Sequence, residues 1–407
     1  MKILVLTNLY PPHYVGAYEL RCAAITEALR LRGHEVQVLT SNHGLQDNQP
    51  VLEPNIERSL HLHGCYGHPW LKLRALKHLE LHNNQTLRES LMVHQPDVVH
   101  VWSMDGLSKS LCLTLQRSAV PTVYNVSDNW ISRSLTGDVW LNWWNRRQGS
   151  FASRIHRALW TLLGIRRRCD VIAPTNPISE IHFNRLYFSS ARLRELTAVQ
   201  GHKVQHGGVI HCPVDTKHFQ GTPVTRPPRN WLWVGRLAED KGILTALRAL
   251  LLIKNSFAGE LHVYGKGDDA YVTMLKNFAA GNSLPVSWHS ATPAEMPDVY
   301  RAHDALLFTS ECEEPFALTP LEAMACGLPV IGTMTGDRRE LFRHGQNAVT
   351  YDAGAATQLA ERILLLQTED HLRTNIAQTG HKEAHERFAM APIVAQVEEC
   401  LRESLPE

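Results

Sequence analysis

The chain has 407 residues, a formal net charge of +1, and 44% hydrophobic and 20% charged residues. This length is too great for one comfortable core and suits two domains. A near-neutral charge gives no overall field for nucleic acid or a strongly acidic partner. The eight cysteines include no C-x-x-C pair, which favours a reducing compartment over a disulfide or zinc framework. The first apolar run is too short for a signal peptide, and no run predicts a transmembrane helix.

The first half of the chain alternates short β-branched runs with amphipathic helical runs. The expected strands are Ile3–Thr7, Glu35–Thr40, Val98–Trp102, Pro121–Val126 and Asp170–Ala173, and the expected helices are Tyr18–Arg32 and Asp105–Arg117. Residues 41–96 are polar and rich in histidine, and we expect a long excursion there with a helix near Leu71–His94. Such alternation predicts a parallel sheet with helices on both faces.

The second half repeats this alternation. The expected strands are Trp231–Val234, Glu260–Tyr264, Val286–His289, Ala305–Phe308 and Val330–Ile331, and the expected helices are Gly242–Lys254, Asp269–Ala280, Ala294–Ala302, Pro320–Ala325 and Ala355–Leu366. The polar, proline-rich stretch 221–229 between the halves is the predicted linker. We therefore expect two doubly wound α/β domains joined near 215–229, with the default binding site in a cleft between them.

Two glutamates lie around the predicted start of one of these helices. Thr319 can cap this helix, Pro320 suits its first position, and Gly327 fits its C-terminal cap. This arrangement puts Glu314 on the preceding loop and Glu322 in the first turn, where backbone N–H groups favour an anion such as a phosphate. The alternative is structural, with Thr319 and Glu322 forming a capping box and Glu314 a solvated loop charge.

Two cations follow the predicted strand Trp231–Val234. Gly235 permits close backbone approach, Arg236 offers a planar fork for phosphate oxygens, and Lys241 adds a compact point charge. Both cations can reach one diphosphate, although they can instead pair with neighbouring acidic side chains at the surface. Because the sequence has no D-x-D triad, we expect protein cations and helix N-termini to stabilise a leaving diphosphate, without a metal.

Taken in order, these segments resemble the signature of the family 4 glycosyltransferases. The resemblance rests on the G-R-x4-K-G segment from Gly235, the E-x7-E spacing of Glu314 and Glu322, and the A-M-A-C-G-L-P-V segment that follows. Weaker similarities extend it over nearly the whole chain, at Leu9–Gly16, Leu29–Val38, Val214–Phe219 and His262–Gly267.

This family consists of retaining enzymes that use nucleotide-sugars and have the GT-B fold. The resemblance therefore implies an α/β protein of two doubly wound Rossmann-like domains facing across an interdomain cleft. Residues 1–214 would form an acceptor-side domain and 215–390 a nucleotide-sugar-binding domain. Residues 391–407 would form a C-terminal helix that crosses back to the first domain.

Carried over by position, the resemblance implies a role for each motif residue. Arg236 and Lys241 would bind the diphosphate and stabilise it as the leaving group, beside Gly235. Glu314 would face the donor sugar near its reactive carbon, and Glu322 would accept hydrogen bonds from the ribose. The remaining donor contacts would come from the backbone of Gly16, Phe316, Ala317 and Leu318.

The chain departs from the family pattern in three places. The family's first glycine pair reads Gly16-Ala17 here, and a second reads Gly336-Asp337. Ser127 stands where the family often has a histidine that contacts the donor sugar. Its neighbour Asp128 is a candidate catalytic residue or acceptor contact, or alternatively a residue that forms an Asx-type turn.

The stretch 139–169 has seven arginines, four tryptophans and no Asp or Glu. This composition suits an anionic membrane or a lipid-diphosphate acceptor. The alternative, which we favour for 151–165, is a domain helix with arginines in water and an apolar face against the core. The residues of that face would be Phe151, Ile155, Leu159 and Leu162.

A histidine-rich segment resembles a metal site in composition only. It comprises His61, His63, Cys65 and His68. Because the chain has 23 histidines, chance proximity is the better explanation, and we expect no metal.

The predicted function is metal-independent, retaining transfer of a hexosyl unit from a nucleotide-diphosphate sugar to a hydroxyl acceptor, in bacterial polysaccharide or glycolipid assembly. No cofactor beyond the donor is expected. The partners would be a saccharide, lipid-linked or small-molecule acceptor and an anionic membrane surface at 139–169, with no nucleic acid. We expect a cytoplasmic protein, peripheral on the inner face of the membrane. The alternatives are a non-catalytic sugar-nucleotide binding protein, a nucleotide-sugar isomerase or hydrolase, and a phosphorylase.

Overall fold

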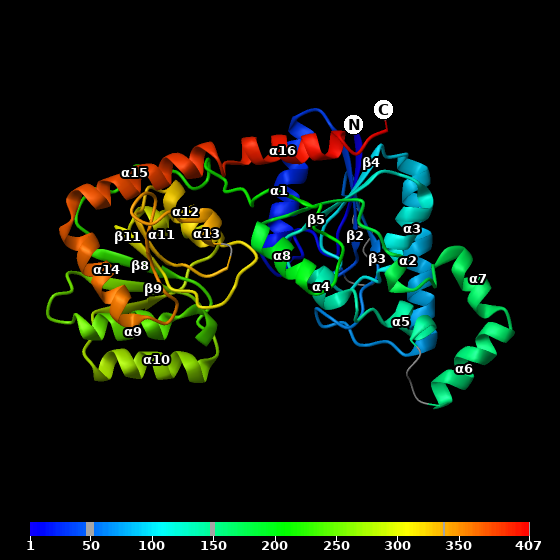
Figure 1. Ribbon diagram of the computed structural model, residues 1–407, viewed down its shortest axis with the longest axis horizontal. Coiled ribbons are helices and arrows are strands. Elements are labelled where there is room, and N and C mark those ends of the chain that lie inside the picture. Colours follow the sequence, from blue (N-terminus) through cyan, green and yellow to red (C-terminus); the bar gives the residue numbers. More distant parts are fainter. Residues whose placement is uncertain (46–52, 147–150, 337, 407) are drawn as a thin grey trace. The chain divides into compact units, whose positions relative to one another are not determined.

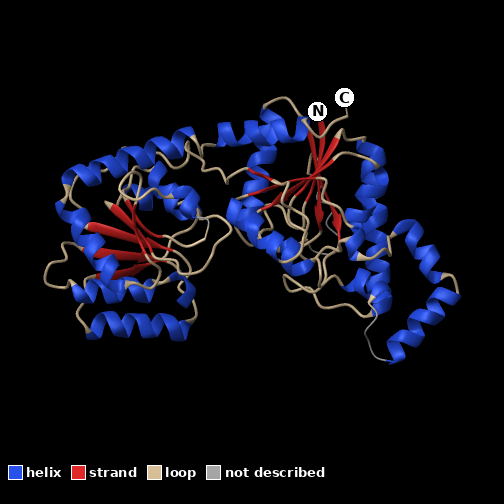
Figure 2. Cartoon of the chain, in the orientation of Figure 1, coloured by secondary structure: helices blue, strands red, loops and turns tan. Residues whose placement is uncertain are grey.

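The computed structural model describes residues 1–45, 53–146, 151–336 and 338–406. The chain divides into two compact units, of which unit 1 comprises residues 1–210 and 394–407 and unit 2 comprises residues 211–393. Each unit has a twisted sheet with helices packed around it (Figures 1 and 2). The α/β class expected from the alternating pattern is confirmed.

Unit 1 contains a parallel sheet with the strand order β3-β2-β1-β4-β5-β6-β7. Its first strand pairs with β2 on one side and β4 on the other, so the direction of winding reverses between β1 and β4. Ligands of such sheets bind at the carboxyl ends of the strands near this reversal. The strands are β1 (Lys2–Leu6), β2 (Glu35–Ser41), β3 (Ile56–Leu60), β4 (Val98–Val101), β5 (Thr122–Val126), β6 (Arg185–Phe188) and β7 (Gly208–Val209).

Helices cover the sheet of unit 1, which explains why its central strands are buried over almost their whole length. All four residues of β4 are buried, as are the last four of both β1 and β5. The helices are α1 (Ala17–Leu31), α2 (Leu73–His94), α3 (Ser110–Ser118), α4 (Trp130–Ser134), α5 (Val139–Asn145), α6 (Phe151–Leu162), α7 (Ile165–Ile172) and α8 (Ala191–Val199), with a 3₁₀ turn at Ile178–Glu180.

Unit 2 repeats this plan with the strand order β10-β9-β8-β11-β12-β13, again all parallel. Here the winding reverses between β8 and β11. The strands are β8 (Asn230–Val234), β9 (Glu260–Tyr264), β10 (Val286–His289), β11 (Ala305–Phe308), β12 (Val330–Thr333) and β13 (Val349–Tyr351). The helices are α9 (Ile243–Leu252), α10 (Asp269–Gly281), α11 (Met296–Arg301), α12 (Leu318–Ala325), α13 (Arg338–Leu341), α14 (Ala356–Thr368) and α15 (Asp370–Glu386), with a 3₁₀ turn at Glu239–Lys241. The last helix, α16 (Met390–Arg402), starts in unit 2 and belongs to unit 1 from Val394 onward.

The strands predicted for the second half are all present, whereas one predicted for the first half is wrong. Residues Asp170–Ala173 do not form a strand, because α7 continues to Ile172. A short apolar run of this length does not distinguish a strand from a helix end. The strand that pairs with β5 is β6, which begins 15 residues further on at Arg185.

Three short strands and one helix start were also missed. The excursion 41–96 contains the predicted helix as α2 but also the strand β3, and neither β7 nor β13 was expected. The helix predicted from Asp105 begins at Ser110, because the chain first forms turns in which Leu107 N–H donates to Met104 O and Leu111 N–H to Ser108 O. Strands of two to five residues carry too little periodicity to be recognised locally.

The proline-rich stretch 221–229 is not a linker. It lies within unit 2, where the N–H of Val224 donates to Gly327 O at 2.8 Å. Asp304, whose side chain is 2% exposed, accepts from the Arg229 N–H at 3.0 Å and pairs with Arg226 at 2.6 Å. These contacts fix a segment that its composition alone suggested was extended and free.

The last residues of the chain pack on unit 1. Glu398 of α16 pairs with Arg32 at 2.6 Å, with His34 at 3.0 Å and with Arg402 at 2.6 Å. Hydrogen bonds from Arg402 and then Arg32 and His34 lower the pKa of Glu398 to about 2. This carboxylate therefore holds the end of α16 against the turn that follows α1.

The favoured interpretation of residues 151–165 is wrong about the direction of the apolar face. The helix exists as α6, but none of its residues is buried. Its side facing the domain carries Trp160, which packs against Trp143 with 5.2 Å between ring centroids. At 100° per residue the predicted apolar stripe lies on the opposite side and is exposed. Phe151, Ile155, Leu159 and Leu162 are 76%, 53%, 48% and 85% exposed.

Figure 1 shows α6 and α7 projecting outward from the rest of unit 1. Among the described residues, no helix has the length and apolar character needed to cross a membrane. The exposed stripe of α6 is therefore a surface feature of this projecting pair of helices.

Candidate active site

The helix that contains Glu322 begins earlier in the chain than predicted. Helix α12 starts at Leu318, preceded by Ala317 in an extended conformation, and no side chain caps its N-terminus. The predicted cap Thr319 is the second helical residue, and Pro320 is tolerated at the third because an N–H there would have no intrahelical partner. Glu322 accordingly lies in the second turn. Both the predicted cap and the alternative capping box are wrong.

The C-terminal end of α12 agrees with the sequence prediction. Gly327 has a φ of +85°, and a Cβ there would lie 2.2 Å from Thr222 O, so only glycine fits. The N–H of Leu328 donates to Ala323 O at 2.9 Å and that of Gly327 to Met324 O at 2.9 Å. This pair of hydrogen bonds is the Schellman motif, and it turns the chain directly into β12.

The structure brings together the two predicted charged motifs of unit 2. The Nζ atom of Lys241 lies 2.6 Å from Oε1 of Glu314, although the two residues are 73 positions apart. Ser310 Oγ donates to the same carboxylate oxygen at 2.6 Å. The side chains of Lys241 and Glu314 are 21% and 20% exposed, so the pair is partly enclosed but open to a ligand.

Backbone hydrogen bonds fix the two motif loops to each other. The N–H of Glu311 donates to Asp240 O at 2.9 Å, and that of Cys312 to the same oxygen at 3.2 Å. Thr309 Oγ1 donates to Lys241 O at 2.8 Å. The loops follow β8 and β11, which are neighbours where the winding of the sheet reverses. The fold therefore positions Lys241 and Glu314 at the place where such sheets bind ligands.

Arg236 forms an ion pair with an acidic neighbour at the surface, which is the alternative to a role in binding a diphosphate. Its guanidinium lies 3.2 Å from Asp240, and its side chain is 66% exposed. An exposed pair of this kind contributes only about 0.2–1 kcal/mol. Arg236 can therefore exchange Asp240 for a stronger anion at little cost. Gly235 precedes it directly after β8, where its N–H donates to Tyr264 O at 3.1 Å.

Glu322 lies behind the loop, where it accepts a hydrogen bond from the Tyr300 hydroxyl at 2.8 Å. Burial raises the pKa of Glu322, and the Tyr300 hydrogen bond opposes this effect. Tyr300 is fully buried on α11, so it fixes the orientation of the carboxylate. No pattern in the sequence indicates this contact, because Tyr300 belongs to a different helix.

The segment from Phe316 to Leu318 forms the entry to α12. The ring of Phe316 packs against His211 and Phe388, with centroids 5.4 and 6.2 Å apart. His211 Nε2 lies 3.1 Å from Glu340. Sequence reasoning missed His211, which lies outside the motifs. At the second of the family's glycine pairs, Gly336 follows β12, whereas Asp337 lies outside the described residues.

In unit 1, Gly16 occupies the N-cap position of α1. Its backbone is extended, with φ −150° and ψ −170°, which any residue can adopt. Its N–H donates to Glu19 Oε2 at 2.9 Å, and a Cβ built on Gly16 would meet only that atom, at 3.8 Å. The conformation of this loop therefore does not require glycine, and the donor contact at Gly16 stays a prediction.

Asp128 follows β5 and has the predicted turn geometry, since its Oδ1 accepts from the Trp130 N–H at 3.0 Å. Burial, followed by the charge of Asp105, raises the pKa of Asp128 to about 6. The hydroxyl of Ser127 is directed to Asn125 Oδ1 at 2.7 Å. Asp128 is thus a carboxyl group that can change protonation near neutral pH.

A buried chain of neutral polar groups runs beneath Asp128. Trp102 Nε1 donates to His100 Nδ1 at 3.2 Å, which leaves the imidazole proton on Nε2, 2.8 Å from the Tyr187 hydroxyl. Burial lowers the pKa of His100 to about 3, so this histidine is neutral. Asn125 Nδ2 donates to Tyr187 at 2.9 Å, and the Tyr18 hydroxyl donates to the Asn125 carbonyl oxygens. The sequence contained no motif for this network.

The histidine-rich segment does not converge on a common point. His61 stacks on His82 with centroids 4.2 Å apart, His63 contacts Trp70 edge-on, and His68 hydrogen-bonds His43 at 3.0 Å. Within the described ranges, no group of three or more His, Cys, Asp or Glu side chains could hold a metal ion.

Comparison with known proteins agrees with this geometry. The family model described as "Glycosyl transferases group 1" matches residues 215–383, and the "Glycosyl transferase 4-like domain" matches residues 16–194. An uncharacterized glycosyltransferase of Methanocaldococcus jannaschii is 23% identical over 413 residues, covering 96% of this chain and 95% of the relative. The N-acetyl-alpha-D-glucosaminyl L-malate synthase of Bacillus anthracis is 22% identical over 413 residues, covering 98% and 96%.

Among solved structures, the Anabaena protein HepE in complex with UDP and glucose is similar in fold, with a TM-score of 0.67 and 20% identity, covering 99% of this chain and all of that one. The matched family models, the full-length relatives and this shared architecture agree with the motifs in both units. The chain is a glycosyltransferase of the GT-B fold and belongs to glycosyltransferase family 4.

Proposed function

We propose that this enzyme transfers a hexosyl unit from a nucleotide-diphosphate sugar to a hydroxyl acceptor with retention at the anomeric carbon. In this reaction the bond from the anomeric carbon to the diphosphate breaks, and the diphosphate leaves with the electron pair. A bond to the acceptor oxygen forms on the same face of the sugar, and the hydroxyl proton passes to the departing diphosphate. The observation that carries this proposal is the Lys241–Glu314 pair at the winding reversal of unit 2.

The roles of the side chains follow from their chemistry. Lys241 and Arg236 would compensate the charge that develops on the leaving diphosphate, a kind of stabilisation that contributes strongly to catalysis. Glu314 orients Lys241 and would face the donor sugar, while Glu322, fixed by Tyr300, would accept from the ribose hydroxyls. The backbone at Gly16, Gly235, Phe316, Ala317 and Leu318 would complete the donor contacts.

We propose further that no metal takes part. Two acidic side chains of the loop after β11 are already engaged, because Glu311 accepts from Thr245 Oγ1 at 2.6 Å and Glu314 pairs with Lys241. A divalent cation that bridges a diphosphate needs several free oxygen ligands. The cations Lys241 and Arg236 would supply this charge instead.

UDP is the first nucleotide to test, because the structural relative HepE binds UDP. Thermal unfolding should be followed with UDP, GDP and ADP, each with and without EDTA. Binding to the folded protein alone raises the unfolding temperature, and saturating ligand at 100 times its dissociation constant adds about 2.7 kcal/mol. One nucleotide should stabilise the protein equally with EDTA. Loss of this stabilisation with EDTA would disprove metal independence, and no response to any nucleotide would disprove donor binding.

The stereochemistry needs a separate experiment. Incubation with the stabilising nucleotide's α-linked sugar conjugate and an accepted hydroxyl compound should give an α-linked product by proton NMR. A β-linked product would disprove retention. Conversion of the donor at an undiminished rate without any acceptor would identify a hydrolase or isomerase instead.

We also propose that the exposed stripe of α6 rests on an anionic membrane surface. Its apolar residues face away from the domain, and the exposed Arg154 lies beside the stripe, whereas Arg157 turns toward the domain and lies over the Trp143 ring. An amphipathic helix of this composition binds at the lipid interface, and each basic residue near an anionic surface contributes about 1 kcal/mol. Since the stretch 139–169 has no acidic side chain, nothing on it opposes this attraction.

Flotation with vesicles of phosphatidylcholine and phosphatidylglycerol tests this proposal. The wild type should float at low salt and less at high salt, because the Debye length falls to about 3 Å at 1 M. Leu162→Asp, at an 85% exposed position, should abolish flotation. The matched control is Val199→Asp at the 86% exposed end of α8, which should float normally. Equal flotation of both variants would disprove a role for α6.

A further inference from the structure

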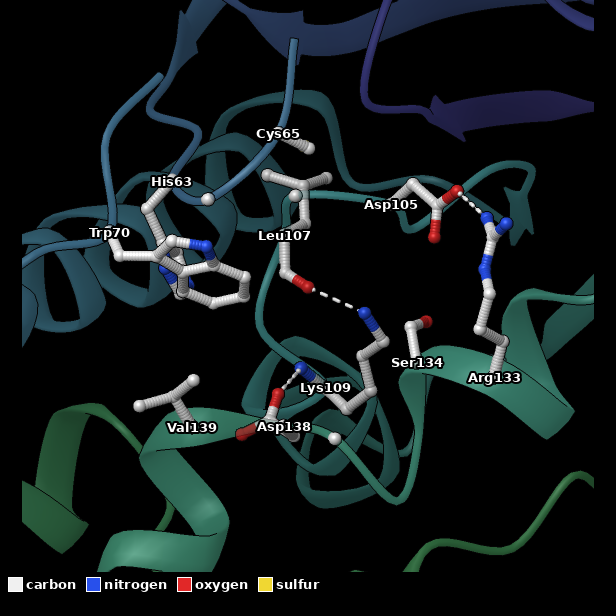
Figure 3. A pocket seen from close by; sticks show the side chains of 13 residues that line it. His63, Cys65, Trp70, Asp105, Leu107, Lys109, Arg133, Ser134, Asp138 and Val139 are labelled. Atoms are coloured by element: carbon white, nitrogen blue, oxygen red, sulfur yellow. Dashed lines mark hydrogen bonds and ion pairs between the residues drawn. The ribbon is translucent and has the colours of Figure 1, made fainter. Parts of the chain in front are cut away.

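Unit 1 contains a cavity at the carboxyl edge of its sheet, and none of the predicted catalytic or donor-binding residues lines it. Its volume is about 330 Å³, within the range of roughly 300–1,000 Å³ for small-molecule sites. The walls come from segments that follow three strands: His63 to Trp70 after β3, Asp105 to Lys109 after β4, and Arg133 to Val139 after β5. Figure 3 shows Trp70, Leu107, Lys109 and Arg133 around this space.

An exposed tryptophan forms one wall of the cavity. All ten tryptophans lie in the described part of the chain, and Trp70, at 68%, is exposed while the other nine are buried or partly buried. Its indole rests on the backbone of Gly64, where a Cβ would come within 2.6 Å of the ring and where φ is +71°. The loop therefore holds this large apolar surface in a fixed place in contact with water, which is unfavourable unless a ligand covers it.

The charged groups of the cavity are already paired with the protein. Arg133 lies 2.7 Å from Asp105, and Lys109 Nζ donates to the backbone oxygens of Met104 and Leu107, both at 2.8 Å. Asp138 accepts from the Lys109 N–H at 2.8 Å and also from Leu141 and Ser108. With two cations and two anions, the lining has no net charge. An ionic ligand would gain no net attraction here, whereas a neutral ligand with several hydroxyl groups could use the remaining hydrogen-bonding capacity.

One buried polar atom also lacks a partner. His63 is 8% exposed, and its Nδ1 has no hydrogen-bond partner among the described residues. Burial lowers the pKa of His63, so the ring is neutral. A hydroxyl group can donate to this nitrogen or accept from it, whichever tautomer is present. Leaving such an atom unpaired costs about 1–3 kcal/mol, and because protein atoms cover Nδ1 in this structure, a bound hydroxyl would recover that cost only after a small rotation of the ring.

We infer that this cavity binds a neutral sugar ring of the acceptor. One face of a pyranose ring presents C–H groups that can stack on Trp70, while its rim presents hydroxyls for His63 and the Asp105–Arg133 pair. The inference rests on the proposed function, because it assigns the acceptor class of the same enzyme. Asp105 of the cavity lining also lies close enough to Asp128 for its charge to contribute to raising the pKa of that carboxyl.

Saturation-transfer NMR on the full-length protein tests this assignment with a panel of methyl glycosides of glucose, galactose, mannose and N-acetylglucosamine. UDP in the same samples reports on the donor site independently. At least one glycoside should receive saturation from the wild type. Trp70→Ala should weaken its binding at least 10-fold, and Trp70→Phe, which keeps an aromatic face, should stay within 3-fold. The matched control is Met92→Ala, at a 66% exposed position on α2 that should leave binding unchanged.

The outcomes separate this inference from the proposed donor chemistry. Normal UDP binding without binding of any glycoside would overturn the sugar assignment. Glycoside binding that survives Trp70→Ala would overturn the location. Binding of succinate, included as a charged comparison, in place of the glycosides would overturn the neutral class. Glycoside binding that depends on Trp70 but occurs without UDP binding would support this site and count against the donor proposal.

Discussion

The two units share one strand order around the reversal of winding but differ in what they place at the carboxyl edge. In unit 2 the edge carries partly exposed ions, with Lys241 held by Glu314 and Arg236 loosely paired with Asp240. In unit 1 it carries a buried chain of neutral groups around Asn125 and a cavity whose charged side chains balance to no net charge, with one exposed tryptophan. We therefore propose that the same architecture serves a diphosphate in one unit and a neutral polyol in the other.

The manner in which the charges are held explains this difference. The ions of unit 2 lie on loops, where they retain some solvent and can exchange partners with an incoming anion at low cost. Two titratable groups of unit 1, His100 in β4 and Asp128 just after β5, are instead buried and partly buried, respectively, and burial favours their neutral forms. His100 and Asp128 both show this effect, with a lowered and a raised pKa respectively.

The largest expected effect comes from removing the charge in unit 2. Lys241→Met should lower turnover on the order of 100- to 1,000-fold, the loss typical for removal of one group that stabilises charge in a transition state. Steady-state assays of nucleotide release should show this loss with a normal unfolding temperature. The matched control is Lys276→Met, which removes the same charge from an exposed position on α10. Activity of Lys241→Met within 3-fold of the wild type would break the proposed contrast between the units.

The second prediction concerns the protonation of Asp128 in unit 1. The folded-state pKa of about 6 lies above the ordinary 3.8, so the contribution of Asp128 to stability is full below pH 3.8 and is lost as the pH rises through about 6. The difference between these two pKa values corresponds to at most about 3 kcal/mol in the free energy of unfolding. Asn resembles the neutral carboxyl group, so Asp128→Asn should equal the wild type at acidic pH and exceed it in stability above pH 6. Urea unfolding of both proteins between pH 4.5 and 7.5 measures this gap, and a gap independent of pH would contradict the raised pKa.

The smallest expected effect tests whether the site of unit 2 depends on its local backbone. Gly327→Ala should destabilise the protein by about 1–3 kcal/mol, because the left-handed conformation is strained for alanine and its Cβ would clash with Thr222 O. Gly281→Ala on α10 is the control, since a Cβ there meets nothing within 4 Å. Hydrogen exchange should become faster in α12 and β12 of the first variant, with unit 1 unchanged. Faster exchange spread over both units would instead indicate that they unfold together.

Much of the fold follows from local pattern. Central strands such as β1 and β11 are continuously apolar because helices cover both faces of the sheet, and this pattern is visible without any tertiary information. The short strands β3, β7 and β13 were missed because so few residues show no period. The linker at 221–229 was assigned incorrectly, because composition does not show that Asp304 fixes this stretch.

The candidate site was predictable to the level of which residue types lie at the carboxyl ends of which strands. The sequence alone indicated Arg236, Lys241, Glu314 and Glu322, because loops after buried strands carry function in such sheets. It could not indicate Ser310 or Tyr300 as their partners, since such hydrogen bonds carry no spacing rule. The predicted start of α12 is wrong, because Thr319 is a residue type that often caps a helix but here is the second helical residue.

The sequence by itself determined the alternation of strands and helices, the division into two α/β halves and the charged loops of the second half, because each depends on residues close together in the chain. The tertiary structure alone decided that Lys241 meets Glu314 across 73 residues, that Trp70 lines a cavity with Asp105 and Arg133, and that the apolar stripe of α6 faces outward. These features depend on the order of strands in the sheet and on which face of a helix meets the core. Both are set by packing between distant segments, which local sequence does not encode.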